Sequence, residues 1–322
     1  MGEAARSLAD GVMKAWDNLV RQVDEVLGWS PAPQPGGPAA AMADGELYQG
    51  LRAEASALIA AIGPEGQARF TVEGDPRWRF NLPVTPAEHV RAMFSEASDG
   101  FGEAVAALDS HASSASIAAV ACLAENLVRA RWLLEPADAG ERRERGYALT
   151  AEAIAWFRQT SRRAEDAGGA DETGLAREIA DRADTMEARL ADLIRDDGRR
   201  LVPVPKRRLL LQAYLPGASL APFALFSAAG SRPASTPSAL FYREPGTGNA
   251  LHNFQRRHLT RAYWLGHTIT FYADLCETAG PDLGRGDWQE TIASAEAWFR
   301  PLAEEAGRRY RQRLHSGLHP GL

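Results

Sequence analysis

The chain has 322 residues, of which 45% are apolar and 24% charged, a composition typical of a globular protein with a sizeable core. Its formal net charge is −6, so the chain as a whole has no basic field to attract nucleic acid or an anionic membrane. Two cysteines are too few for a disulfide framework, and no apolar run predicts a membrane-spanning helix. We therefore expect a cytoplasmic protein.

The first part of the chain predicts one amphipathic helix within residues 1–29. Its apolar side chains recur at steps of four and three and so share one face: Leu8, Val12, Trp16, Leu19, Val23 and Val26. A Pro/Gly/Ala-rich linker follows over 30–44, which we do not expect to hold regular structure. The helix is therefore tethered, and must bury its apolar stripe against the main body or against a second copy in a homodimer. Met42 leaves open a second translation start besides Met1.

Residues 45–322 are predicted to form a single helical domain. Helical spacing of apolar residues occurs over 45–62, 86–109, 113–135, 138–165, 172–197, 205–228, 255–279 and 287–314. The clearest start signal is Thr85, Pro86 and Glu88, which are a cap residue, a first-turn proline and a third-position glutamate. Strand-like alternation is confined to 68–82, a short hairpin or an irregular loop. The expected fold class is all-α, a multi-helix bundle.

A connection over 230–254 interrupts this helical pattern and is long for a bundle. Because it carries several large apolar residues, we expect it to pack over the helices as a covering loop. Its side chains Tyr242, Arg243 and His252 are of the kind that a ligand lid presents. A loop held by its own hydrogen bonds is an equal alternative.

The segment 113–135 predicts the most buried helix, because apolar residues cover almost all of its circumference. Glu125 and Arg129 have the i, i+4 spacing of an ion pair on this helix, and Trp132 follows on the same face. We expect the pair to lie in the interior. The pair either has a structural role and anchors the helix to its neighbours, or it lies at the end of a ligand pocket. Structural ion pairs are the commoner case.

The segment 255–279 places Tyr263, Trp264 and His267 on one face of a helix, together with Phe271 and Asp274. An aromatic face with one histidine can bind an apolar ligand and supply an acid or a base. Packing of the same residues in the core is the alternative.

The run LAENLVRARWLLEP, followed by ERRERG, resembles uncharacterised helical proteins common in actinobacteria, in which a helix ending WLLDP precedes an RRxxR turn. Those proteins are similar to HEPN-type domains, and the resemblance covers residues 111–150. It implies an α-helical fold. The relatives' late Ser-x-x-His-Gly element has no His-Gly counterpart here, which puts a shared function in doubt. HEPN ribonucleases use an Arg and a His four to six residues apart; Arg261 and His267 have that spacing, which also arises by chance.

No motif predicts a cofactor or a metal: DDxxD, paired Glu-x-x-His, HExxH and GxSxG elements do not occur. The leading hypothesis is a loop-covered, mainly apolar pocket for a small organic molecule, in a cofactor-independent protein of bacterial specialised metabolism. Whether it is an enzyme stays open. The alternatives are a HEPN-like interaction or defence protein, with ribonuclease activity, and a non-catalytic partner-binding bundle.

Under the leading hypothesis each candidate residue has a role. The candidate acids and bases are His267, His252 and Glu125. The candidate substrate-binding residues are Arg129, Trp132, Tyr242, Arg243, Tyr263 and Trp264.

Overall fold

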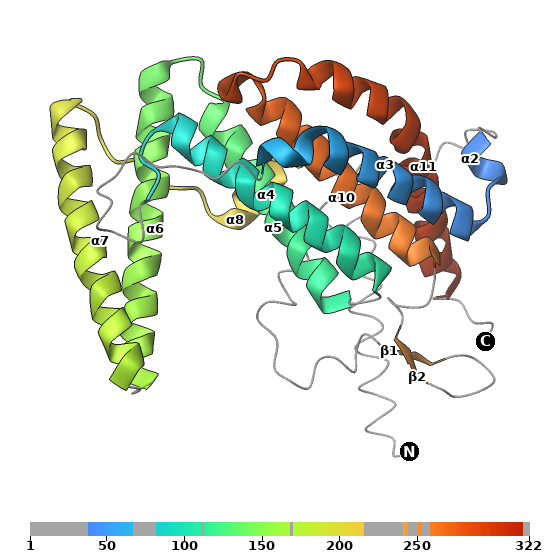
Figure 1. The fold of residues 1–322 in the computed structure, drawn as a ribbon, viewed down its shortest axis with the longest axis horizontal. Coiled ribbons are helices and arrows are strands. Elements are labelled where there is room, and N and C mark those ends of the chain that lie inside the picture. Colours follow the sequence, from blue (N-terminus) through green and yellow to red (C-terminus); the bar gives the residue numbers. More distant parts are fainter. Residues whose placement is uncertain are drawn as a thin grey trace.

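A computed structural model describes residues 38–66, 82–110, 113–167, 170–215, 241–243, 250–252 and 258–317. These ranges are helical apart from connectors and one small hairpin, so the predicted all-α class is confirmed (Figure 1). The helices are α2 (Pro38–Ala41), α3 (Asp44–Gly66), α4 (Pro86–Asp109), α5 (Ser113–Leu134), α6 (Ala139–Ala167), α7 (Ala170–Asp196), α8 (Arg207–Tyr214), α10 (His258–Ala279), the short 3-10 helix η2 (Pro281–Leu283) and α11 (Trp288–Gly317). Strands β1 (Phe241–Arg243) and β2 (Ala250–His252) pair antiparallel.

The observed helices agree with the predicted segments to within a few residues. The predicted capping box is present at the start of α4, where Thr85 accepts from the backbone of Glu88 and the Glu88 carboxylate accepts from the backbone of Thr85. The segment 205–228 is the exception, since the structure describes a helix only over its first part, α8. The predicted helix within 1–29, residues 68–81 of the possible hairpin and most of the 230–254 loop lie outside the described residues.

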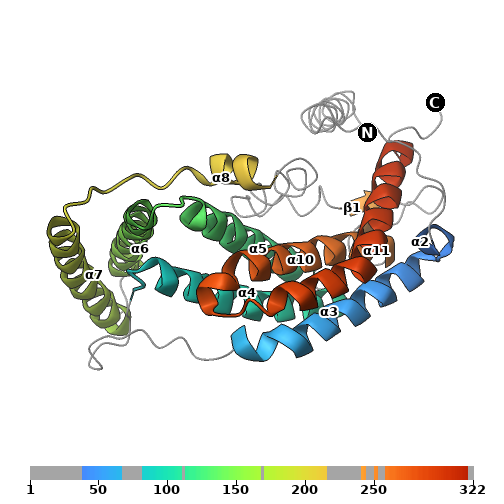
Figure 2. The same ribbon diagram turned by 90° about the horizontal axis from the view of Figure 1, so that it is seen from above.

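The centre of the main bundle is α10, which packs against α3, α4, α5 and α11 (Figure 2). The ring of Tyr272 on α10 stacks on Phe101 with centroids 4.2 Å apart, and its hydroxyl lies 3.1 Å from Ser98 Oγ. Gly266 allows α11 to approach closely, because a Cβ atom there would lie 2.9 Å from Cβ of Ala303. The prediction that the 113–135 helix is the most buried is therefore wrong: α5 is apolar on most sides, but it turns one charged face outward.

Helices α6 and α7 form an arm that stands beside the main bundle (Figure 1). The arm has a small core of its own, which includes Tyr147, Ile154 and Met186. His89 of α4 joins it to the bundle: the buried His89 Nε2 lies 3.0 Å from Thr150 Oγ1, and that hydroxyl lies 2.7 Å from the Pro83 carbonyl oxygen. Burial lowers the pKa of His89 to about 4, so the imidazole is neutral at pH 7.

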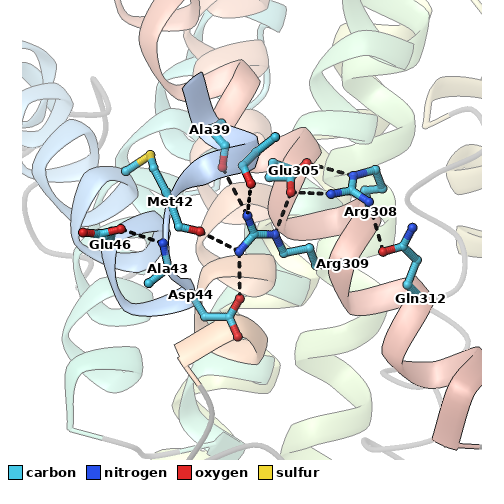
Figure 3. A network of polar contacts seen from close by, with 10 residues as sticks. Ala39, Met42, Ala43, Asp44, Glu46, Glu305, Arg308, Arg309 and Gln312 are labelled. Atoms are coloured by element: carbon cyan, nitrogen blue, oxygen red, sulfur yellow. Dashed lines mark hydrogen bonds and ion pairs between the residues drawn. The ribbon is translucent and has the colours of Figure 1, made fainter. Parts of the chain in front are cut away.

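The end of the predicted irregular linker is ordered, contrary to expectation. Residues 38–41 form one helical turn, and Arg309 of α11 holds its carbonyl end (Figure 3). The guanidinium donates to the carbonyl oxygens of Ala39, Ala40 and Met42, and to the carboxylates of Asp44 and Glu305. A cation at the carbonyl end of a helix satisfies acceptors that the helix itself leaves unpaired. This tertiary contact stabilises a turn that local sequence does not predict.

The exchange Arg309→Met is expected to release residues 38–44 from α11. Hydrogen bonds to a charged group contribute about 1.5–3 kcal/mol, so local opening of this segment should become roughly tenfold more frequent or more. Limited proteolysis by elastase, with cleavage after Ala40, Ala41 and Ala43 followed by mass spectrometry, measures the opening. Arg308→Met is the matched control, because Arg308 contacts Glu305 and Gln312 but not the turn. Equal cleavage rates in the two variants would contradict the role of Arg309.

Among the described residues, none of the helices combines the length and the apolar character needed to cross a bilayer.

Candidate functional site

The polar face of α5 carries the predicted ion pair. Arg129 Nε donates to Glu125 Oε1 over 3.2 Å, and its Nη1 donates to Glu152 of α6. Glu125 Oε2 lies 3.3 Å from Nε of Arg207, at the start of α8. The pair forms as predicted, but the side chains of Arg129 and Glu125 are 24% and 30% exposed, so the pair is partly buried and not enclosed in the interior as expected. The neighbours there are long charged side chains that leave access to water, and their contacts tie α5 to α6 and α8.

Cys122 lies one turn before Glu125, on the same face. Its thiol donates to Glu96 Oε1 over 3.4 Å and accepts from Asn126 Nδ2 over 3.5 Å. Burial, together with Glu96, raises the pKa of the thiol to about 12. Because the thiolate is the reactive form of cysteine, Cys122 is not an activated nucleophile.

Trp132, a predicted substrate-binding residue, is buried between α5 and α6. The Arg145 guanidinium lies 5.2 Å from its ring centroid and donates to its carbonyl oxygen and to Glu135. These contacts fix the connection between the two helices.

Tyr263, Trp264 and His267 lie together on α10, as predicted. The Tyr263 ring meets the imidazole edge-on with centroids 4.6 Å apart, and stacks on Tyr310 of α11 at 4.2 Å. Phe271 follows 5.8 Å from the imidazole. Tyr263 and Trp264 are buried, whereas His267 is partly exposed. The result is an aromatic group with one accessible imidazole.

This aromatic helix and the Glu125–Arg129 pair lie on opposite sides of α5. Arg131 Nη2 donates to Asp274 of α10 over 2.8 Å, which shows that this side of α5 faces α10. Arg129 comes two residues earlier, about 200° round the helix, and faces α6. In the described residues, His267 and Glu125 therefore do not converge on one pocket.

A group of carboxylates beside Arg131 escaped the sequence analysis. Burial raises the pKa of Asp274, and burial together with Glu296 and Asp274 raises the pKa of Glu277. Arg131 pairs with Asp274, and Arg300 pairs with Glu296. The carboxylates lie on the successive helices α10 and α11, whereas Arg131 lies on α5, 143 residues before Asp274, so no local pattern signals this proximity.

Arg261 lies in a buried cluster between α3, α4 and α10. Its Nε donates to the Leu108 carbonyl oxygen over 2.8 Å, and its guanidinium lies 3.9 Å from the Tyr48 ring centroid. Asp109 accepts from the Tyr48 hydroxyl and, over 2.7 Å, from Arg52 Nε. Burial, with the bond to Asp109, raises the pKa of Tyr48 to about 12. The guanidinium that a HEPN-like ribonuclease would need is thus engaged inside the bundle.

The hairpin contains the loop residues predicted to face a ligand. Tyr242 is paired with Leu251, Arg243 with Ala250, and His252 with Phe241. The backbone pairing brings His252 and Tyr242 onto neighbouring strands. Their side chains, and the contacts expected of them, lie outside the described residues.

The arm carries an exposed residue that sequence reasoning missed. Trp156 of α6 is 57% exposed. It lies one turn after Glu152, on the stripe of α6 that faces away from α7 and meets α5 at Arg129. Two turns further along, Arg162 and Arg163 are also exposed. Glu152, Trp156 and Arg163 are spaced i, i+4 and i+11, so Trp156 shares a face with charged residues, which was a sequence signal of its exposure. The adjacent Phe157 also fits a helical apolar pattern and was the more conventional core residue.

An apolar pocket of about 10 Å³ lies within the arm, between α6 and α7, and is lined by residues that include Leu82, Phe157 and Met186. That volume admits about one water molecule and no organic ligand. The described part of the chain contains no group of three or more His, Cys, Asp or Glu side chains placed to hold a metal ion.

Comparisons with models of protein families, with curated proteins and with solved structures gave no match to this chain. The fold and the site therefore define it only as an all-α helical bundle with a two-helix arm.

Proposed function

We propose that this protein is a non-catalytic helical bundle that binds a partner protein through the outer stripe of α6. The observation that carries the proposal is the 57% exposure of Trp156, which lies on the side of α6 away from α7 and one turn beyond the contact of Glu152 with α5. Tryptophan is normally well buried, and an exposed tryptophan on a helix is a common anchor of protein interfaces.

The surroundings of Trp156 support a protein partner with an acidic and apolar face. Arg163, seven residues after Trp156, extends the stripe, and arginine and tryptophan are both enriched at interface hot spots. Nucleic acid fits less well, because the neighbouring α7 presents Asp184 and Glu187, and the chain has a net charge of −6.

The chemistry of the candidate residues supports a non-catalytic role. Glu125 and Arg129 are engaged in ion pairs that join helices, Arg261 is buried, and the Cys122 thiol has a raised pKa. The aromatic group around His267 favours the second candidate, a binding wall for a small apolar molecule.

A photoreactive benzoylphenylalanine at position 156 is expected to capture one partner protein in cells that express the intact chain. With the purified partner, Trp156→Ala should then weaken binding by about 2 kcal/mol, roughly 30-fold in Kd, as measured by calorimetry. Unchanged circular dichroism and Tm would show that the variant folds.

Trp298→Ala is the matched control, because Trp298 of α11 is another exposed tryptophan, at 70% exposure, and lies away from the arm. It should leave the affinity for the partner unchanged. Equal losses of affinity in the two variants would overturn the proposal. Capture of the same proteins by benzoylphenylalanine placed at Thr185 on α7 would also overturn it.

A further inference from the structure

A surface made mostly of small uncharged side chains, with the half-buried Glu54 among them, spans the adjoining helices α3 and α11, on the side away from α10. Its centre is Trp298, whose side chain is 70% exposed. We call it the α3–α11 surface, and its exposed members are Ala53, Ser56, Ala57, Ala60, Ala61, Ala293, Ser294, Ala297, Trp298 and Pro301.

The packing of the two helices makes these residues neighbours. Asp44 of α3 pairs with Arg309 of α11, and a Cβ atom on Gly50 would lie 2.9 Å from Cδ1 of Leu302, so the helices run antiparallel (Figure 2). Trp298 lies one turn before Leu302. In this register it lies opposite Glu54, one turn after Gly50, and Ala53 and Ala57 are next to that position on the outer side of α3.

The shape of the surface fits another helix. Alanine and serine side chains let a helix backbone approach closely, while a large aromatic side chain supplies an anchor at the edge. Half-buried Leu302 continues the apolar area between the helices. An occupant should therefore be helical, with one continuous apolar stripe.

We propose that residues 1–29 of this chain occupy the α3–α11 surface in the same molecule. Their sequence has the required stripe, from Leu8 to Val26, with Trp16 near its middle. The stripe spans 18 residue steps, about 27 Å as a helix, so it is long enough to cover the exposed members of the surface, which span eight residue steps on each helix, about 12 Å.

The point at which the chain leaves the described residues supports this occupant. Pro38 begins the turn that Arg309 holds on α11, and Arg309 and Trp298 lie eleven residues apart, within about 20° on the same stripe of that helix. Their separation along the axis is about 16 Å. Residues 30–37 can span up to about 28 Å, so the connector reaches the surface without strain.

Tethering favours the same molecule over a second copy. A short flexible connector gives an effective concentration in the millimolar range, which exceeds the concentration of a second chain under ordinary conditions. The Arg309 network keeps the connector's attachment point beside the surface, which raises that advantage.

The test uses the full chain with benzoylphenylalanine in place of Trp298, irradiated at sub-micromolar concentration. The expected product has the mass of one chain, and digestion should join position 298 to a peptide from residues 1–29. The same probe in place of Trp156 should not reach that peptide.

Two variants with the same added charge complete the test. Leu19→Asp places a carboxylate on the stripe and is expected to lower the docking equilibrium constant about tenfold, seen as reduced crosslinking. Asn18→Asp lies off the stripe and should leave the yield unchanged. A product of twice the chain mass that contains the N-terminal peptide would assign the surface to a second copy. That result, the absence of a crosslink to 1–29, or equal yields from the two variants would each overturn the proposal.

Discussion

Replacing Asp109 by alanine is expected to lower the free energy of unfolding by about 3 kcal/mol, because it leaves a buried charge without its counterion. Asp109 Oδ1 lies 3.6 Å from Arg261, whose side chain is only 9% exposed. The same carboxylate accepts from Tyr48 and Arg52. In the variant, Arg261 would keep its bond to the Leu108 carbonyl oxygen and its contact with the Tyr48 ring, but it would lose the nearby carboxylate. Equilibrium denaturation followed by circular dichroism at pH 7 measures the loss.

Arg52→Ala is the matched control for Asp109. It removes another member of the same cluster, but its side chain is 48% exposed, and exposed ion pairs contribute about 1 kcal/mol or less. We therefore expect a larger loss of unfolding free energy in Asp109→Ala than in Arg52→Ala. Similar losses would show that burial of Arg261 does not govern the stability of this cluster.

The pH dependence of stability is expected to report on His89. Its pKa is about 4 in the folded chain and 6.5 in the unfolded chain, so the unfolded chain binds the proton first as the pH falls. Neutral His89 therefore contributes its full stability above about pH 6.5, and that contribution is lost progressively down to about pH 4. The difference corresponds to about 3 kcal/mol.

The variant His89→Gln should retain a hydrogen bond to Thr150 without titrating. Its free energy of unfolding should vary less between pH 6.5 and pH 4 than that of the unaltered chain. His258→Gln removes a histidine that is exposed at the start of α10, and should keep the original profile. If His89→Gln and the unaltered chain show parallel profiles, the buried imidazole does not control the acid response.

Much of the secondary structure follows from local sequence. Helical periodicity depends on residues three and four apart, which explains why the ends of α4 and α5 were predicted closely. The Thr85–Glu88 capping box and the Glu125–Arg129 pair are also local, and both formed. The turn at 38–41 was missed because it depends on Arg309, which is far away in the chain.

The candidate site was less predictable, because a helical pattern says which residues share a face but not what that face meets. Arg129 and Arg131 both lie on a helix that is apolar at most positions, and only the packing sends one to α6 and the other to α10. Trp156 and Trp264 both fit an apolar stripe, yet one is exposed and the other buried.

By itself, the sequence determined the all-α class, the positions of most helices and the local ion pair, since backbone hydrogen bonding and side-chain periodicity act over a few residues. Only the tertiary structure decided that α10 rather than α5 is central, that Arg261 is enclosed by Tyr48 and Asp109, and that Trp156 and Trp298 face solvent. Those outcomes depend on contacts between segments far apart in the chain, whose free energies no local pattern encodes.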